Sequence, residues 1–331
     1  MARLDIWMPV WNGESTLPAA LRSLQRQTFR DWRLIAVDDG STDRTPEILE
    51  RAGVQAIRLP HGGVVKALQA AARASDAPLV ARMDADDLCH RERLAEQIVV
   101  KADVVGTRVK ITSLPSEAPD VGERRRGPEG LRHYARWQNS LVSHDDIVNG
   151  MFVESPIANP SALFTRDLYE RVGGYRDVAW PEDYDFWHRA REAGARFAKV
   201  PRVLVAWRDR PDRLTRTHAM YSEKAIRAAK LHYLARHDFV KRGPLTVWGA
   251  GPIGRAWMRD LKAIGVAVEQ AIDIDPKKLG RVVAGGVPVR PPEAVKPPVL
   301  GAVGSRGARA LIKTRLVAAG MVEGRDFLFV A

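Results

Sequence analysis

Cysteine is almost missing from this chain of 331 residues, in which Cys89 is the single example. One thiol excludes an internal disulfide and any cysteine-rich zinc site, and it fits the reducing cytoplasm. The sequence also lacks an uncharged apolar run of about 18 residues, so we expect no membrane-spanning helix. Asp5 interrupts the first apolar run, which disfavours a signal peptide. We therefore expect a cytoplasmic protein and leave open a peripheral contact with the inner face of a membrane.

Basic residues outnumber acidic ones, with 52 Lys and Arg against 40 Asp and Glu and a formal charge of +12. Such a balance favours anionic partners, for example nucleotide phosphates, acidic glycans, anionic lipid headgroups or nucleic acid. The basic residues are scattered and form no recognisable nucleic-acid-binding motif, so a nucleic-acid-binding module is the weaker alternative and no such partner is expected.

Short apolar strands alternate with helix-like segments, which is typical of a parallel α/β architecture. Strands are predicted over 4–10, 32–39, 54–60 and 78–84, and helices over 15–27, 41–50 and 64–75. Between 106 and 130, proline, glycine and charge predict a long surface loop. A second α/β pattern begins near residue 245. The chain length favours two domains, which we place at 1–237 and 245–331 with a linker over 238–244.

Carboxylates gather at the ends of two of these strands, where ligands bind in open α/β sheets. Asp84 ends the fourth strand and Asp86 and Asp87 follow it, and carboxylates at this spacing can hold Mg²⁺ or Mn²⁺, which can bridge a diphosphate. The alternative is a solvated turn in which Asp86 or Asp87 caps the following helix. Asp38 and Asp39 end the second strand, and their "VDDGSTD" setting also fits ordinary turn chemistry.

A third acidic group opens a helix in "WPEDYDFW". Carboxylates in a first helical turn are favoured by the positive helix end, which is one interpretation. The other is catalytic, because a general base needs a reachable carboxylate whose surroundings tune its pKa. Asp183 is the candidate base, and three aromatic residues suited to stacking a sugar or partly desolvating a base lie nearby: Trp180, Tyr184 and Trp187.

The motifs "MPVWN", "VDDGSTD", "HGGVVKAL", "ARMDADD", "NPSALFTRDLYERVGGYRD" and "PEDYDFW" follow one another in that order. In this combination, residues 1 to about 236 resemble the family 2 glycosyltransferases. The resemblance implies a GT-A fold with a mixed, mainly parallel sheet. It also implies a nucleoside-diphosphate-sugar donor and inversion of the anomeric centre.

The resemblance also implies roles for single residues. The donor base and ribose would be lined by Pro9, Asn12, Asp38 and Asp39. Asp84 would contact the ribose or the metal, Asp86 would be the principal ligand of Mn²⁺ or Mg²⁺, and Asp87 would lie nearby. Asp183 would deprotonate the acceptor hydroxyl, and Glu182 beside it would orient the acceptor.

One stretch departs from the family pattern. Where members often carry an aromatic-Arg-x-His sequence, this chain has Asp209 and Arg210, and His218 lies farther along. We interpret His218 as exposed and non-binding, which puts a third protein ligand in doubt. Arg208, Arg210 and Arg213 could pair with the diphosphate or form a solvated basic loop.

The C-terminal segment carries a glycine motif, "VWGAGPIGR", with Gly249, Gly251 and Gly254 between a predicted strand and helix. Asp273 follows 24 residues after Gly249, near the place of a ribose-binding acid in dinucleotide sites. The segment is too short for a complete dinucleotide domain with a catalytic domain of its own. It resembles a small Rossmann-like module with a second nucleotide site or, as we favour, a structural or regulatory role.

The function predicted from these residues is metal-dependent transfer of a sugar, with inversion, from a nucleoside-diphosphate sugar to a hydroxyl of a glycan or lipid-linked acceptor. The alternative is a nucleotide-sugar oxidoreductase or epimerase, or a nucleotide-binding regulatory protein, that uses the C-terminal glycines. The C-terminal segment has no Tyr-x-x-x-Lys pair, which disfavours the oxidoreductase.

Overall fold

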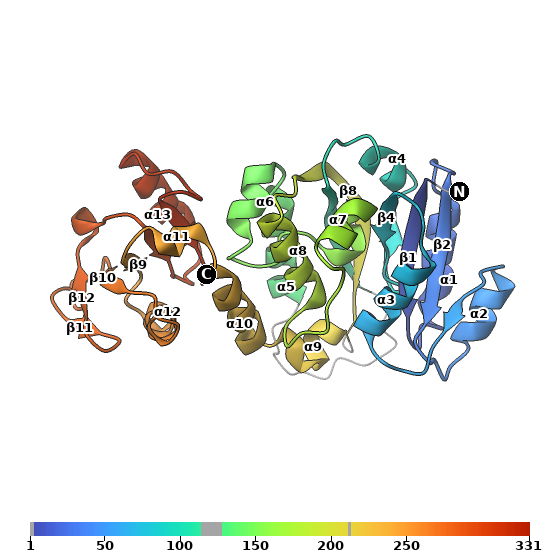
Figure 1. Cartoon of the computed structure of the whole chain (residues 1–331), viewed down its shortest axis with the longest axis horizontal. Coiled ribbons are helices and arrows are strands. Elements are labelled where there is room, and N and C mark those ends of the chain that lie inside the picture. The colour runs from blue at the N-terminus through green and yellow to red at the C-terminus, as the bar shows by residue number, and fades with distance from the viewer. Residues whose placement is uncertain (1–2, 114–127, 211–212) are drawn as a thin grey trace. The chain divides into compact units, whose positions relative to one another are not determined.

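The computed structural model describes residues 3–113, 128–210 and 213–331 (Figure 1). The chain divides into two compact units. The first contains Met1–Ile147 and Pro156–Ser222, and the second contains Val148–Ser155 and Glu223–Ala331. The second division therefore falls after Ser222, earlier in the chain than the boundary predicted from the sequence.

The first unit is built on an eight-stranded sheet in the described residues. Its strands are β1 (Leu4–Val10), β2 (Trp32–Asp38), β3 (Ile57–Arg58), β4 (Leu79–Arg82), β5 (Leu88–Cys89), β6 (Val104–Ser113), β7 (Leu163–Thr165) and β8 (Phe197–Asp209). Their order is β3-β2-β1-β4-β7-β6-β8-β5. Strand β1 runs parallel to β2 and β4, β7 is antiparallel to β4 and β6, and β6 is parallel to β8. The predicted mixed, mainly parallel α/β sheet is confirmed.

Helices connect these strands. They are α1 (Leu17–Gln25), α2 (Thr45–Arg51), α3 (Val64–Ala74), α4 (Arg93–Gln97), α5 (Pro128–Ser140), α6 (His144–Gly150), α7 (Arg166–Arg171), α8 (Glu182–Glu192) and α9 (Leu214–Thr217), with 3₁₀ turns η1 (Asn159–Ser161) and η2 (Ala219–Tyr221). Helix α6 spans the division between the units.

Strand β1 shows how the sequence pattern makes the core. One face carries Leu4, Ile6, Met8 and Val10, which are buried in one cluster with apolar side chains of α1: Leu17, Leu21 and Leu24. This combines the period of two of a strand with the period of 3.6 of a helix. Trp7, on the other face, makes edge contacts with Phe164 and Tyr169. With both faces covered, the carboxyl end of β1 is rigidly placed.

Strand β8 is continuous over two apolar runs, 195–200 and 202–207, because pairing with β6 continues past Pro201 through an irregular register. The predicted loop over 106–130 is too long, since β6 continues to Ser113 and α5 begins at Pro128. The rest of that prediction, 114–127, lies outside the described residues.

The second unit contains a six-stranded, mostly parallel sheet in the order β11-β12-β10-β9-β13-β14. Its strands are β9 (Leu245–Trp248), β10 (Val268–Ile272), β11 (Val282–Val283), β12 (Val287–Arg290), β13 (Val299–Gly301) and β14 (Phe327–Phe329). Its helices are α10 (Glu223–Leu234), α11 (Asp238–Lys241), α12 (Pro252–Ala263) and α13 (Ala308–Ala318), with the 3₁₀ turn η3 (Pro292–Ala294). A second α/β sheet was predicted, but the hairpin β11–β12 was missed, so the segment holds six strands despite its length.

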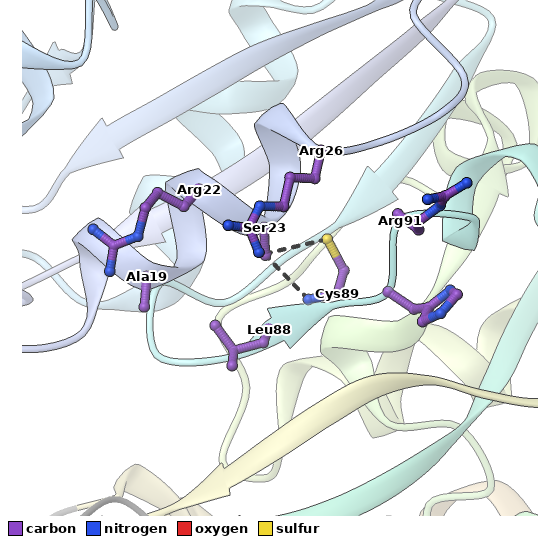
Figure 2. Close-up of a pocket in the computed structure, with 8 residues that line it drawn as sticks. Ala19, Arg22, Ser23, Arg26, Leu88, Cys89 and Arg91 are labelled. Carbon is purple, nitrogen blue, oxygen red and sulfur yellow. Dashed lines mark hydrogen bonds between the residues drawn. The ribbon is translucent and has the colours of Figure 1, made fainter.

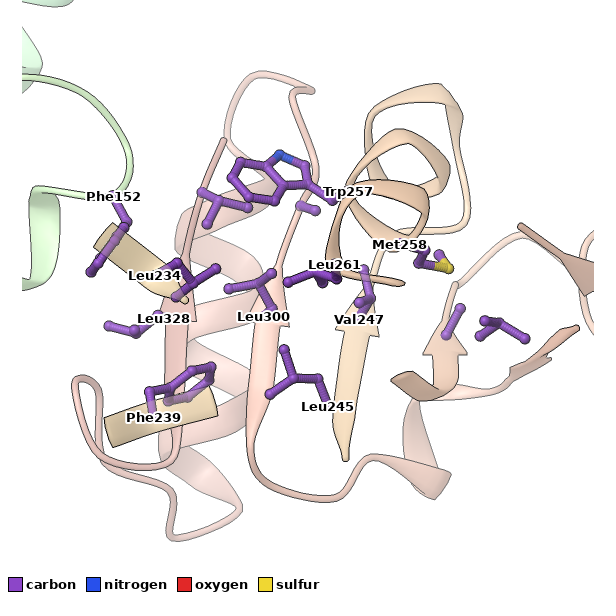
Figure 3. Close-up of a cluster of buried hydrophobic side chains, with 14 of the residues drawn as sticks. Phe152, Leu234, Phe239, Leu245, Val247, Trp257, Met258, Leu261, Leu300 and Leu328 are labelled. Carbon is purple, nitrogen blue, oxygen red and sulfur yellow. The ribbon is translucent and has the colours of Figure 1, made fainter. Parts of the chain in front are cut away.

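The core of the second unit recruits residues from outside 245–331 (Figure 3). Phe152, Leu234 and Phe239 are buried in one cluster with Leu245 and the other strand and helix side chains. The Nζ atom of the buried Lys230 donates to the carbonyl oxygens of Val153 at 2.7 Å and Val330 at 3.2 Å. The stretch predicted as a linker thus contains α11 and a core residue, because Phe239 is 2% exposed.

Across the described ranges, the longest apolar helical stretches fall short of what a bilayer crossing requires.

Candidate active site

The turns after β1 and β2 are joined by a set of short hydrogen bonds. Asn12 has a left-handed φ of 48°, its N–H donates to Ser41 Oγ at 2.9 Å, and its Oδ1 accepts from the N–H of Thr42 at 2.9 Å. The buried Asp38 accepts from the N–H of Ser41 at 2.9 Å. Pro9, partly exposed in β1, pairs in register with Val37 of β2. Pro9, Asn12 and Asp38 therefore lie at one edge of the sheet, because the carboxyl ends of the parallel strands β1 and β2 meet there.

Asp39 has a different task from its neighbour. Its Oδ1 accepts from the N–H of Gly62 at 2.9 Å, and its Oδ2 accepts from the N–H of Gly63 at 2.8 Å. Oδ2 also lies 3.0 Å from Nδ1 of His61. Both carboxylate oxygens therefore fix the loop that leads into α3, which supports a structural role for this residue.

Trp11 is a candidate that the sequence reasoning missed. Its side chain follows β1, is 50% exposed, and stacks on His61 with ring centroids 4.5 Å apart and an interplanar angle of 22°. A large apolar ring so exposed at a strand end offers a flat face to a ligand. The signal was available, because Trp11 lies between Pro9 and Asn12 in "MPVWN".

The three carboxylates after β4 come together. Asp84, Asp86 and Asp87 each offer an oxygen, and these oxygens lie within 4.8 Å of one another. Asp87 is 1% exposed, and its Oδ2 has no hydrogen-bond partner in the described part of the chain. Burial and the charge of Asp84 raise the pKa of Asp86, and burial, Asp86 and Asp84 raise the pKa of Asp87 well above its ordinary value. Like charges are thus held together at a cost that a cation would offset.

Two buried arginines hold this cluster in place. Arg82 is fully buried, and it donates to the carbonyl oxygen of Trp7 at 2.6 Å and to Oδ1 of Asp84 at 2.8 Å. Arg208 donates from its backbone N–H to Oδ1 of Asp87 at 2.8 Å and from its side chain to the carbonyl oxygen of Asp86. The alternative of a helix cap is wrong, because Glu92 occupies the cap position of α4 and no side chain caps that helix.

The basic residues at the end of β8 and after it divide into separate roles. Arg208 is 7% exposed and is held by the acidic loop, so it belongs to the scaffold. Arg210 places Nε 3.8 Å from Oδ2 of Asp86, and Arg213 lies over the ring of Trp207 at 4.5 Å. His218 is exposed, and its Nδ1 accepts from the N–H of Met220 at 3.3 Å.

The acidic pair at the start of α8 is partly sequestered. Glu182 is 3% exposed, and its carboxylate accepts from Nδ2 of Asn159 at 3.3 Å and from the hydroxyl of Tyr221 at 3.2 Å. Asp183 is half-buried, and its Oδ1 accepts from the N–H of Tyr184 at 2.7 Å. Burial raises the pKa of Glu182, and burial together with the charge of Glu182 raises the pKa of Asp183 well above its ordinary value. A carboxylate with a raised pKa is a stronger base at neutral pH.

The two acidic sites share one electrostatic environment. The pKa of Asp183 is raised by burial, by Glu182 and also by the charge of Asp84, whereas the buried Arg82 lowers it. The pKa of Glu182 responds to Asp84 and Arg82 with the same signs. The charges of Asp84 and Arg82 therefore act on carboxylates about 100 positions away in the sequence.

The aromatic residues beside this pair are mostly core residues. Tyr184 and Trp187 are fully buried, so the expectation that they stack a sugar is wrong. Trp180 is partly buried and donates from Nε1 to Oδ1 of Asp185 at 3.0 Å. Asp185 also pairs with Arg189 at 2.7 Å. The apolar period of α8 accounts for these side chains without a substrate.

A separate cavity of about 420 Å³ lies between α1 and the segment after the acidic cluster (Figure 2). It is lined by Ala19, Arg22, Ser23, Arg26, Leu88, Cys89, His90 and Arg91. The Sγ atom of Cys89 lies 3.4 Å from Ser23 Oγ, and burial raises the pKa of this thiol. Cys89 is therefore a protonated packing residue, and the cavity contains none of the candidate acidic groups.

The C-terminal glycine motif is largely explained by packing. A Cβ atom on Gly254 would lie 1.8 Å from the carbonyl oxygen of Gly249, and Gly249 itself has a φ of +119°. Asp273 accepts from the N–H of Ala250 at 2.9 Å and from Nζ of Lys278 at 3.0 Å. Although burial alone would raise the pKa of Asp273, hydrogen bonds from Asp275, Ala250 and Lys278 lower it. These residues close the turn on itself, which supports the structural interpretation over a second nucleotide site.

Comparison with known proteins agrees with this architecture. The family description "Glycosyl transferase family 2" matches residues 5–173. An uncharacterized glycosyltransferase of Haemophilus influenzae is 27% identical over 208 residues, which are 60% of this chain and 62% of that protein. The amylovoran biosynthesis glycosyltransferase AmsE of Erwinia amylovora is 24% identical over 250 residues, which are 73% of this chain and 90% of AmsE. The chain thus spans less than two thirds of the first relative and most of the second.

The fold has a solved counterpart. The crystal structure of S. aureus TarS 1–349 in complex with UDP-GlcNAc superposes with a TM-score of 0.50 at 16% identity, covering 79% of this chain and 80% of that one. At this identity the likeness shows a common fold and no more. The sheet topology, together with the sequence order of the acidic clusters, is that of a GT-A-type glycosyltransferase. The family match covers about half of the chain, and the protein belongs to glycosyltransferase family 2.

Proposed function

We propose that this protein transfers a sugar from a nucleoside-diphosphate sugar to a hydroxyl group of a glycan or lipid-linked acceptor, with inversion of the anomeric centre. The observation that carries the proposal is the gathering of three carboxylates after β4, where Asp84 pairs with the buried Arg82 at 2.8 Å and where the charges of both residues shift the pKa of Glu182 and Asp183. One site can thus hold the diphosphate end of a donor beside a base for the acceptor.

The acidic cluster fits a divalent cation. Its oxygens are within 4.8 Å of one another, Oδ2 of Asp87 is buried without a partner in the described residues, and Asp86 is 27% exposed. Asp86 and Asp84 would be the ligands, because oxygen donors alone suit Mn²⁺ and Mg²⁺. When bound, such an ion supplies positive charge to the leaving nucleoside diphosphate. Arg210 and Arg213 add positive charge on the same side, since both lower the pKa of Asp86 against burial.

The donor base and ribose would occupy the edge formed by Pro9, Asn12 and Asp38, with the exposed ring of Trp11 as a stacking surface. Asp183 would accept the proton of the acceptor hydroxyl, which then attacks the anomeric carbon opposite the leaving diphosphate. A single displacement inverts the anomeric centre and needs no covalent intermediate. The acceptor class follows from the family and not from a contact.

A thermal-shift panel tests this proposal. Nucleoside diphosphates and nucleotide sugars are added with and without Mn²⁺ to the native protein and to Asp86→Ala. We expect at least one nucleotide to stabilise the native protein in a Mn²⁺-dependent manner and Asp86→Ala to lose that dependence. Asp167→Ala is the control, because this exposed carboxylate lies on α7 outside the site. A panel in which nothing stabilises the native protein would contradict the proposal.

The same structure leaves the alternative less support. An oxidoreductase or nucleotide-binding regulator would use Gly249, Gly251, Gly254 and Asp273, yet Asp273 is already engaged by the turn and by Lys278. Bound nicotinamide, detected by its absorbance, would revive that function.

A further inference from the structure

Glu182 has both carboxylate oxygens occupied by other side chains of the protein. Oε1 accepts from Nδ2 of Asn159, and Oε2 accepts from the hydroxyl of Tyr221. Asn159 is itself oriented, because its Oδ1 accepts from the hydroxyl of Tyr175 at 3.2 Å. A carboxylate that is 3% exposed and doubly hydrogen-bonded is poorly placed to orient an acceptor sugar.

Asp183 differs from its neighbour in this respect. It is half-buried, its Oδ1 accepts from the N–H of Tyr184, and its Oδ2 accepts no hydrogen bond within the described residues. One oxygen therefore fixes the side chain while the other is available for a proton. Glu182 and Asp183 carry the same functional group, and they differ in the hydrogen bonds that they accept.

Tyr221 donates one of the two hydrogen bonds to Glu182, and it comes from a distant part of the chain. It ends η2, 39 residues after Glu182, next to the point where the first unit ends. We propose that Tyr221 is a positioning residue of the transfer reaction, whose hydroxyl holds Glu182 beside Asp183 so that Asp183 receives the acceptor proton. This inference rests on the proposed function and adds a residue that no sequence motif indicated.

Electrostatics supports the same arrangement. Burial, followed by the charges of Glu182 and Asp183, raises the pKa of Tyr221 well above its ordinary value, so its hydroxyl remains a donor. Burial raises the pKa of Glu182, while Arg82 and the Tyr221 hydrogen bond lower it. Loss of the hydroxyl would favour a neutral Glu182, and the negative charge that strengthens Asp183 as a base would be diminished.

Tyr221→Phe is the test, because it keeps the ring and removes only the hydroxyl. Sugar transfer and donor affinity are measured with the nucleotide sugar and metal that stabilise the native protein. A hydrogen bond to a charged group suggests a kcat about 10- to 100-fold lower, with the donor Kd within about twofold of native. Glu182→Gln should also lower kcat, and the double variant should be no worse than Glu182→Gln alone, because both changes break one interaction.

The control is Tyr134→Phe, which removes a hydroxyl that contacts Gln138 on α5, and it should keep native kcat. Unchanged thermal midpoints and donor affinity establish that Tyr221→Phe is folded with an intact donor site. Native kcat in Tyr221→Phe, or effects of Tyr221→Phe and Glu182→Gln that multiply in the double variant, would overturn the inference. A native protein that no nucleoside diphosphate or nucleotide sugar stabilises would instead overturn the proposed function.

Discussion

Replacing Asp183 by asparagine removes the charge of this side chain and keeps its shape. Asparagine retains an Oδ1 that can accept from the N–H of Tyr184, so α8 should begin as before. It cannot take a proton from an acceptor hydroxyl. Because general bases typically contribute about 10²- to 10⁴-fold, we expect kcat to fall by that factor while donor affinity stays close to native.

The same substitution should stabilise the metal-free protein. Burial and Glu182 raise the pKa of Asp183 in the folded state above its unfolded value. The stability linked to the neutral carboxyl is therefore present below the ordinary pKa of Asp and is lost as the pH rises through the folded pKa. Asparagine carries no charge at any pH, so we expect Asp183→Asn to be more stable than the native protein at neutral pH.

Two measurements check this reasoning. The thermal midpoints of the two proteins, measured in EDTA, should nearly coincide at pH 4, and the midpoint of Asp183→Asn should be the higher one at pH 8. Transfer assays with a fixed donor should show the loss in kcat. Native activity in Asp183→Asn would show that the base lies elsewhere. Equal midpoints of the two proteins at both pH values would show that burial and Glu182 do not destabilise the charged form of Asp183 in the folded protein.

Three further substitutions, two of them with a matched control variant, probe the rest of the molecule. Asp86→Ala should abolish the metal-dependent thermal shift and, by relieving like-charge repulsion, leave the metal-free protein at least as stable as native. Trp11→Ala should weaken donor binding by about tenfold in calorimetry, since stacking on a base contributes about 1–3 kcal/mol, while Trp11→Phe should recover most of it. Gly254→Ala should destabilise the second unit by about 1–3 kcal/mol in hydrogen exchange, because its Cβ would meet the carbonyl oxygen of Gly249 at 1.8 Å. Gly251→Ala, whose Cβ would meet nothing within 4 Å, should cost about 1 kcal/mol or less through the helix cap.

The sequence was sufficient for features whose cause is local. Alternation of apolar residues placed β1, and the turn residues after β1, β2 and β4 placed Asn12, Asp38 and Asp84 at one sheet edge. The glycines before α3 and α12 and the acidic start of α8 were equally readable. Each depends on periodicity or on backbone conformations that a few residues specify.

What the sequence could not supply depends on contacts between distant segments. No residue near Asp39 in the sequence indicates that its carboxylate oxygens accept from the amides of Gly62 and Gly63. These hydrogen bonds support a structural role for Asp39, whereas Asp38 lies at the edge of the site. Arg82 resembles any charged residue at a strand end, and only the fold buries it against Asp84, from where its charge also acts on Glu182 and Asp183. Tyr221 contacts Glu182 only in the folded protein, because the two residues are 39 positions apart in the sequence. Tertiary contacts of this kind have no period and no fixed spacing.

The excursion of Val148–Ser155 into the second unit limits how this protein can be divided or recombined. A fragment that begins at residue 223 would keep the six strands of the second sheet but lose Phe152 from its core and the Val153 carbonyl that receives Lys230. Loss of a buried phenylalanine side chain costs about 3–5 kcal/mol, a large share of the stability of a typical domain. Dividing the chain at one position therefore cannot give a fragment that contains the whole second unit and nothing else. An exchange between relatives, in the laboratory or in a genome, has to carry the short internal segment along with the C-terminal one.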